Sequence, residues 1–137
     1  MAVVEELIRE ESDGTLSFGN FDLDTKTKVS DFPHAGDLYK VKTFREITKL
    51  EKNGLFVYES VPGTVVSHLD QTDSGIRFLV EAKEDVQITL ELEPEQEYKV
   101  FVDKTNVGKM KTNLGGKLVL SVEITPDCPV AINVERL

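Results

Sequence analysis

Alternation of apolar and polar residues is the feature that most limits what this chain can fold into. In a β-strand successive side chains point to opposite faces, so a period of two predicts a strand with one buried and one wet face. The pattern at Tyr39, Val41 and Thr43 fits this rule in the first part of the chain. Five further apolar series repeat it: Ile76-Phe78-Val80, Val86-Ile88-Leu90-Leu92, Tyr98-Val100-Val102, Leu118-Leu120-Val122-Ile124 and Val130-Ile132-Val134. The sequence therefore predicts an all-β fold.

Turn-forming residues separate these runs. Asn53-Gly54 stands between residues 47–52 and 55–61 and is the sequence signature of a type I′ hairpin. Asp13-Gly14 and Ser74-Gly75 mark further turns. Short strands with turns every 8–12 residues are typical of sandwiches and barrels. We expect an antiparallel β-sandwich or a jelly-roll-like fold, with an N-terminal β-meander packed on it.

Two segments are ambiguous between helix and strand. Residues 1–11 carry a helical stripe at Val3, Val4, Leu7 and Ile8, but the turn at Asp13-Gly14 favours a strand that opens a hairpin. Residues 43–50 are assigned to a strand because the hairpin signal follows them. For both segments the strand is the preferred interpretation, and the helix remains the alternative.

The strongest candidate for a domain boundary is Val61-Pro62-Gly63. Residues 1–62 hold seven of the ten aromatic residues, and we expect them to form an aromatic-rich β-meander. Residues 63–137 hold about seven evenly spaced runs rich in Val, Leu and Ile, which are enough for a small antiparallel sandwich. A meander of about 60 residues has little core of its own, so it is expected to pack on the second part or on a partner chain. The two parts can equally form one continuous domain.

The charge balance argues against some partners. The chain has 16 Lys and Arg against 25 Asp and Glu, for a net charge of -9, and its longest basic cluster is Lys109-Met110-Lys111. Phosphate binding needs clustered cations, so nucleic acid is not an expected partner, and an acidic membrane surface would repel the chain. The N-terminal residues contain no apolar signal-peptide core, and no stretch approaches about 20 apolar residues. A cytoplasmic protein is expected.

Residues suited to catalysis or to zinc binding are few. The chain has two histidines, His34 and His68, and one cysteine, Cys128, whereas a zinc site needs about four ligands. Cys128 lies beside Asp127, which is the wrong setting for a reactive thiolate. We therefore expect no cofactor and no enzymatic activity.

Two pairs of carboxylates are candidates for a calcium site. Asp22 and Asp24 form one pair, and Asp70 and Asp73 form the other. Carboxylate oxygens are ligands that calcium prefers, although neither segment has the spacing of an EF-hand loop. The alternative is turn chemistry, in which an Asp side chain accepts hydrogen bonds from its own backbone.

Phe56 and Tyr58 are the candidate ligand-binding residues. Perfect alternation places both rings on one face, opposite Leu55 and Val57, so one of the two pairs is expected to be exposed. Exposed aromatic rings are the usual stacking platforms for sugars. A position in the core or in a subunit interface is the alternative for the same rings.

Two resemblances add to this reading. Residues 98–103, 108–113 and 116–122 resemble strands of the accessory β-sandwich modules of extracellular glycan-active enzymes. Residues 36–54 and 56–63 are similar to a group of small bacterial all-β proteins, some of which carry the label "endosialidase". The first resemblance implies a sandwich fold, and the second carries over no catalytic residues. Sialidases resemble large propellers of at least four blades, which this chain is too short to build.

These observations favour a non-enzymatic assembly or protein-interaction module, with a homo-oligomer as one expected form. A carbohydrate-binding accessory module is the first alternative, supported by the sandwich-like second part. A small glycan hydrolase is the second alternative, supported by the label of the similar group. Self-association or a protein partner is expected first, and a glycan second.

Overall fold

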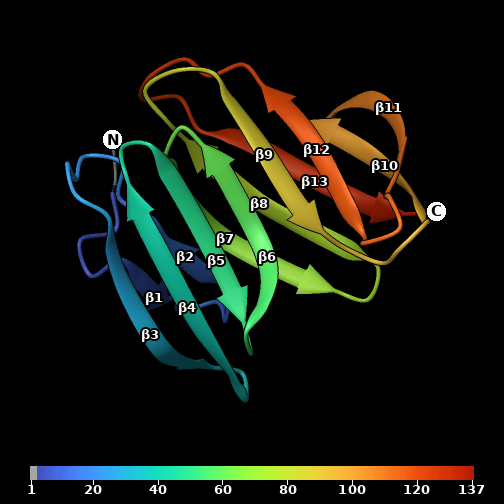
Figure 1. Ribbon diagram of the computed structural model, residues 1–137. Helices are drawn as coiled ribbons and strands as arrows, with labels where there is room; N and C mark the ends of the chain where they lie inside the picture. The colour runs from blue at the N-terminus through green and yellow to red at the C-terminus, as the bar shows by residue number, and fades with distance from the viewer. Residues whose placement is uncertain (1–2) are drawn as a thin grey trace.

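The computed structural model describes residues 3–137 as two antiparallel β-sheets packed face to face, an all-β sandwich (Figure 1). The predicted fold class is confirmed. The strands are β1 (Ile8–Glu10), β2 (Leu16–Phe18), β3 (Thr27–His34), β4 (Asp37–Phe44), β5 (Ile47–Lys52), β6 (Leu55–Val61), β7 (Val65–Thr72), β8 (Gly75–Glu81), β9 (Val86–Glu91), β10 (Glu97–Val102), β11 (Thr105–Lys111), β12 (Lys117–Val122) and β13 (Val130–Arg136).

The chain passes repeatedly between the two sheets. The seven-stranded sheet has the order β1-β2-β7-β8-β13-β10-β11, and the six-stranded sheet has the order β12-β9-β6-β5-β4-β3. Strands β3 to β6 form a meander of consecutive hairpins, and β6 pairs with β9 from the second part of the chain. At Val61-Pro62-Gly63 the chain leaves the six-stranded sheet and enters β7 of the seven-stranded sheet. Both sheets therefore combine strands from residues 1–62 and 63–137.

The alternating apolar series form the core between the sheets. Ile76, Phe78 and Val80 on β8 are at most 3% exposed, whereas Arg77 between them is exposed. The same alternation holds on β4, β9, β12 and β13. Burial of these side chains is the main favourable term in folding, at about 25 cal/mol per Å² of apolar surface.

The Asn53-Gly54 hairpin forms as predicted. Both residues have positive φ, 51° and 78°, as a type I′ turn requires. The assignment of residues 43–50 to one strand is wrong, because Arg45 and Glu46 form a turn between β4 and β5. Phe44 pairs with Ile47 across that turn. Neither turn residue is Gly, Asn, Asp or Pro, so the turn has no composition signal.

The N-terminal segment forms a strand only at its end. β1 spans three residues and pairs with β2 across the Asp13-Gly14 turn, in the predicted hairpin. Glu5 and Glu6 lie in a turn, and Leu7 has a positive φ of 72°. Residues 1–2 lie outside the described part of the chain.

A group of three aromatic rings packs at the centre of the sandwich. Tyr58 of β6 makes edge-to-face contacts with Phe18 and Phe78, with ring centroids 5.4 Å and 5.6 Å apart. The two partners belong to the opposite sheet, so these contacts join the layers. Such pairs contribute about 0.5–1.5 kcal/mol each beyond the area they bury.

A network of buried hydroxyl groups surrounds Tyr58. Thr64 Oγ1 lies 2.8 Å from both the Tyr58 hydroxyl and Ser60 Oγ. The backbone N–H of Thr64 donates to Thr48 Oγ1, which in turn lies 2.8 Å from Thr43 Oγ1. All five side chains are fully buried. Because every hydroxyl has a partner, the cost of burying these polar groups is offset.

Candidate functional site

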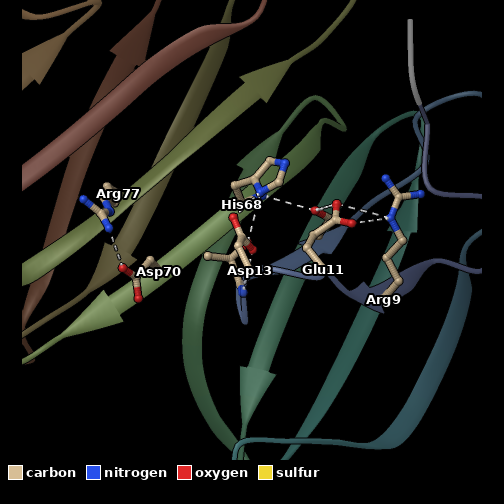
Figure 2. A network of polar contacts seen from close by, with 8 residues as sticks. Arg9, Glu11, Asp13, His68, Asp70 and Arg77 are labelled. Carbon is tan, nitrogen blue, oxygen red and sulfur yellow. Dashed lines mark hydrogen bonds and ion pairs between the residues drawn. The ribbon is translucent and has the colours of Figure 1, made fainter.

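His68 lies at an irregularity in β7. The pairing of β7 with β8 shifts between Ser67 and Asp70, and His68 has a φ of 54°. A positive φ is uncommon outside glycine, and bulges of this kind often re-aim a side chain. The side chain is 48% exposed and lies beside the β1–β2 hairpin (Figure 2).

The β1–β2 hairpin holds the His68 ring. His68 Nδ1 lies 3.0 Å from Asp13 Oδ2 and 3.1 Å from Thr15 Oγ1. Figure 2 shows the Asp13 carboxylate and the imidazole pointing toward each other. A carboxylate only accepts, so Nδ1 carries the proton of this contact. In the neutral ring Nε2 is then an acceptor for a ligand donor.

Hydrogen bonds keep Asp13 ionised. The Thr15 hydroxyl, the Thr15 backbone N–H and His68 together lower the pKa of Asp13 from 3.8 to about 2. The Thr15 N–H donates to Asp13 Oδ1 at 3.0 Å, which is the Asx-turn pattern. At neutral pH the imidazole therefore faces a charged acceptor.

A second set of contacts fixes the backbone of His68. Its N–H donates to Ser17 Oγ at 3.1 Å, and Ser17 Oγ donates to Glu11 Oε2 at 2.6 Å. Arg9 Nε lies 3.3 Å from both Glu11 oxygens. The Ser17 hydroxyl, followed by Arg9, lowers the pKa of Glu11. The strained residue is thus held through its backbone and through its side chain.

An open groove runs from His68 across the outer face of the seven-stranded sheet. It has a volume of 610 Å³, and its apolar floor includes Leu79 of β8, Ala131 of β13 and Phe101 of β10. His68, Arg77 and Asn133 are among the polar residues around it. Figure 2 shows Arg77 paired with Asp70, with Nη2 donating to Oδ2 at 3.0 Å. The groove combines an apolar floor with planar polar groups.

The geometry at His68 suits binding better than nucleophilic catalysis. An activated hydroxyl sits on one ring nitrogen while the orienting carboxylate sits on the other. Here Thr15 and Asp13 both contact Nδ1. The ring is positioned by the hairpin, and the Thr15 hydroxyl is not aligned as a nucleophile.

Phe56 and Tyr58 do not share a face, so that expectation is wrong. Leu50 pairs with Tyr58 and Glu51 pairs with Phe56, which leaves Val57 as an extra residue on β6. An extra residue inverts the alternation. Tyr58 is 0% exposed, and burial raises the pKa of its hydroxyl. It cannot stack on a ligand.

Phe56 turns to the outer face of the six-stranded sheet, where cations cover it. Lys117 Nζ lies 4.2 Å from the centroid of the ring, and Lys49 Nζ lies 5.7 Å away. Phe56 also borders a cleft of 390 Å³ that contains Asp73 and Glu91. Lys117 Nζ is held 3.0 Å from Glu91 Oε1. The Phe56 ring is thus engaged in cation–π contacts with these two lysines.

Two of the four candidate calcium ligands, Asp22 and Asp70, form ion pairs with cationic side chains. Asp22 Oδ1 lies 2.9 Å from Lys83 Nζ, and Asp70 is paired with Arg77. Asp24 is exposed in the segment before β3, and Asp73 lies at the turn between β7 and β8. Among residues 3–137 no group of three or more His, Cys, Asp or Glu side chains is arranged to hold a metal ion.

Only part of the His68 cluster has a signal in the sequence. Asp13-Gly14-Thr15 marks a turn, and an Asp two residues before a Thr is the Asx-turn spacing. Nothing in the sequence links this turn to His68, 53 residues after Thr15. The link depends on the pairing of β2 with β7.

The four sheet edges form a second candidate surface. β1 is only three residues long. β3 contains Pro33 and a register shift between Val29 and Phe32, and β11 pairs through a register shift and carries Lys109 and Lys111. Short length, proline, bulges and lysine are the devices that blunt an edge against another strand.

β12 has none of these devices apart from Lys117 at its first position. It pairs with β9 over six residues in unbroken register, and no proline or charge lies between Leu118 and Val122. Figure 1 shows β12 at one end of its sheet, with β9 on its inner side. Val119 on the outer face is 44% exposed. β12 is the open edge of the sandwich.

Hydrogen bonds show which groups of β12 point away from β9. The Leu92 N–H donates to the Gly116 carbonyl at 2.7 Å. The backbone N–H and C=O groups of Gly116, and of every second residue after it, therefore point toward β9. The backbone N–H and C=O groups of Lys117 point away from β9, and both bond to Asn113, at 3.0 and 3.1 Å. By the same alternation Val119 and Ser121 direct their N–H and C=O groups outward, beyond the sheet.

Residues 3–137 include no helix with the length and apolar character to cross a membrane. In comparison with known proteins, no family model, no curated protein and no solved structure matches the chain.

Proposed function

We propose that the chain is a non-enzymatic protein-interaction module that extends its six-stranded sheet with a strand from a protein partner. The observation that carries this proposal is the open edge at β12, beside three edges that are blunted. A strand added to an edge gains main-chain hydrogen bonds, and alternate side chains provide specificity. The outward groups of Val119 and Ser121 offer such bonds, and exposed Val119 offers apolar contact.

The location of the edge supports the same proposal. Asn113 covers the outward groups of Lys117, so the docking stretch begins at Leu118. It continues to Val122, and the backbone N–H of Ile124 is already bonded to Asp85 Oδ1 at 2.8 Å. Because this docking stretch has a defined start and a short length, it favours one pairing register over several shifted registers.

A synthetic peptide of residues 116–123 is the probe for strand docking. We expect it to shift the amide NMR signals of Val119 and Ser121 and to slow their hydrogen exchange, because these amides would gain acceptors. The peptide is used at millimolar concentration, in large molar excess over the chain, so that it outcompetes a second copy for the edge. The amides of β11, on the edge of the other sheet, serve as the internal reference.

The matched control is the variant Ser121→Pro, which removes one outward donor while Ser121→Thr keeps it. Binding should be lost in the proline variant and kept in the threonine variant. If millimolar peptide leaves Val119 and Ser121 unperturbed in the native chain, strand docking at β12 is refuted.

A saccharide ligand on the seven-stranded sheet is the second candidate function. The observation that favours it is the fixed imidazole of His68 at the rim of a groove with an apolar floor. Sugars present flat apolar faces together with hydroxyl groups, so they suit Phe101 and Leu79 beside His68 and Asn133.

A glycan array tests this second candidate. Phe101→Ala and Asn133→Ala are expected to abolish any binding, whereas Phe56→Ala, on the other sheet, should leave it unchanged. Thermal unfolding of each variant verifies that the fold persists. Failure of the chain to bind any class of polysaccharide would rule the candidate out.

A further inference from the structure

We infer that the strand that docks on β12 is the β12 of a second copy of this chain, antiparallel and related by a two-fold axis through Leu120. This inference rests on the proposed docking function and names its partner. It follows from which backbone groups are open, from the alternation of faces and from the charges at the two ends of the strand.

The alternation of faces limits the possible registers. Directly opposed residues of an antiparallel pair point to the same face, so core-facing Leu118, Leu120 and Val122 must oppose core-facing residues of the partner. A two-fold axis therefore passes through a residue of β12 and not between two residues.

The open backbone groups are best matched with the axis at Leu120. Val119 then opposes the partner's Ser121, and Ser121 opposes the partner's Val119. Each of these pairs exchanges both of its hydrogen bonds, which satisfies every outward group of Val119 and Ser121. Leu120 meets the partner's Leu120 across the axis, on the core side of the joined sheet.

The charges on the outer face agree with this register. Lys117 and Glu123 lie on the outer side, at opposite ends of the stretch, and Glu123 is exposed. The two-fold through Leu120 brings Glu123 toward the partner's Lys117, whose Nζ already lies 3.0 Å from Glu91 Oε1 of its own copy, and the same arrangement forms at the other end. Such symmetric opposite charges favour one register, although exposed pairs add little affinity.

Axes through the neighbouring residues fit less well. An axis at Val119 would set Ser121, inside the docking stretch, against the partner's Lys117, whose outward groups already bond to Asn113, whereas the axis at Leu120 sets only Glu123, beyond the end of β12, against it. An axis at Ser121 would set Glu123 against the apolar side chain of the partner's Val119. Each alternative leaves an outward group or a charge unmatched.

Cysteine cross-linking tests the inference in a Cys128→Ser background, because Cys128 is exposed. Opposed residues of a hydrogen-bonded pair have Cα atoms about 5.5 Å apart, within the range a disulfide spans. With the axis at Leu120, a mixture of Val119→Cys and Ser121→Cys chains forms a cross-linked dimer, whereas neither variant cross-links with itself.

Sedimentation velocity of the native chain supplies the second readout. We expect dimers at micromolar concentration, and Ser121→Pro should raise the dissociation constant by about tenfold or more because it removes donors on both sides of the axis. Ser121→Thr should remain dimeric. Circular dichroism and thermal unfolding confirm that both variants are folded.

The outcomes separate the inference from the proposed function. Peptide docking on β12 by a chain that stays monomeric overturns the inference and leaves the function standing. A dimer in which Val119→Cys or Ser121→Cys cross-links with itself has its axis elsewhere and also overturns the inference. Loss of peptide docking overturns the proposed function itself.

Discussion

The hydroxyl groups of Tyr58 and Thr64 lie 2.8 Å apart, and neither side chain is exposed to solvent. Thr64 Oγ1 also contacts Ser60 Oγ, so it serves two buried groups. Thr64→Val would leave both hydroxyls short of a partner. We expect a loss of about 1–3 kcal/mol in the free energy of unfolding, measured with urea. Tyr58→Phe removes one bond and should cost less, about 0.5–1.5 kcal/mol. An equal cost for the two variants would contradict the shared role of Thr64.

Burial of Tyr58 predicts a loss of stability at alkaline pH. Burial raises the pKa of this hydroxyl in the folded state, whereas the unfolded chain ionises near pH 10. The stability from the neutral group is present below about pH 10 and is lost as the pH rises toward the folded value. The free energy of unfolding should fall between pH 8 and pH 11, and it should fall less in Tyr58→Phe. Tyr39, whose pKa burial also raises, contributes equally to both proteins.

The Asp13–Thr15 contact predicts an unusual acid titration. The carboxyl carbon of Asp13 should titrate in NMR with a midpoint near 2, because the Thr15 hydroxyl and N–H bind the ionised form. Since this folded pKa is depressed, the order of the β1–β2 hairpin is retained above pH 4 and lost as the pH falls toward 2. Thr15→Val should raise the midpoint toward 3.8. Ser17→Ala is the control, since Ser17 lowers the pKa of Glu11 instead.

Gly75, at the start of β8, tolerates no side chain. Its φ is 146°, and a Cβ atom would overlap the carbonyl oxygen of Val134 on β13. Gly75→Ala should lower the free energy of unfolding by at least about 2 kcal/mol, since backbone must move. Gly14→Ala is the matched control, because Gly14 also has a positive φ but has open space around it. It should cost about 1–2 kcal/mol, from the backbone conformation alone.

The sequence predicts most of the fold because apolar periodicity and turn residues act locally. The alternation on β4, β8 and β9 and the Asn53-Gly54 turn are correct residue by residue. The feature that the sequence does not predict, the bulge in β6, arises from the pairing of β6 with a neighbouring strand. An extra residue at Val57 moves Phe56 to the outer face, and no property of Val57 marks it as a bulge. Its cause is the pairing with β5, which the local sequence does not contain.

The candidate sites are harder to predict than the fold. His68 reads as one histidine near a loop, and its contact with Asp13 spans 55 residues. The open edge of β12 is likewise invisible, because its strand pattern is the same as that of β9, which is paired on both sides. Strand order decides which of two similar strands is at the edge, and strand order depends on the whole chain.

Three of the four sheet edges are blunted and one is open, and this difference also determines how large an assembly can become. A sandwich with two accessible edges could add copies at both ends and grow into an open ribbon, as fibrils do. Here β1 is short, β3 has Pro33 and β11 has its bulge, so among the edges formed by residues 3–137 β12 alone is left open. A pair formed at β12, as we infer, would have no acceptor left, so growth would stop at a closed pair however concentrated the protein becomes.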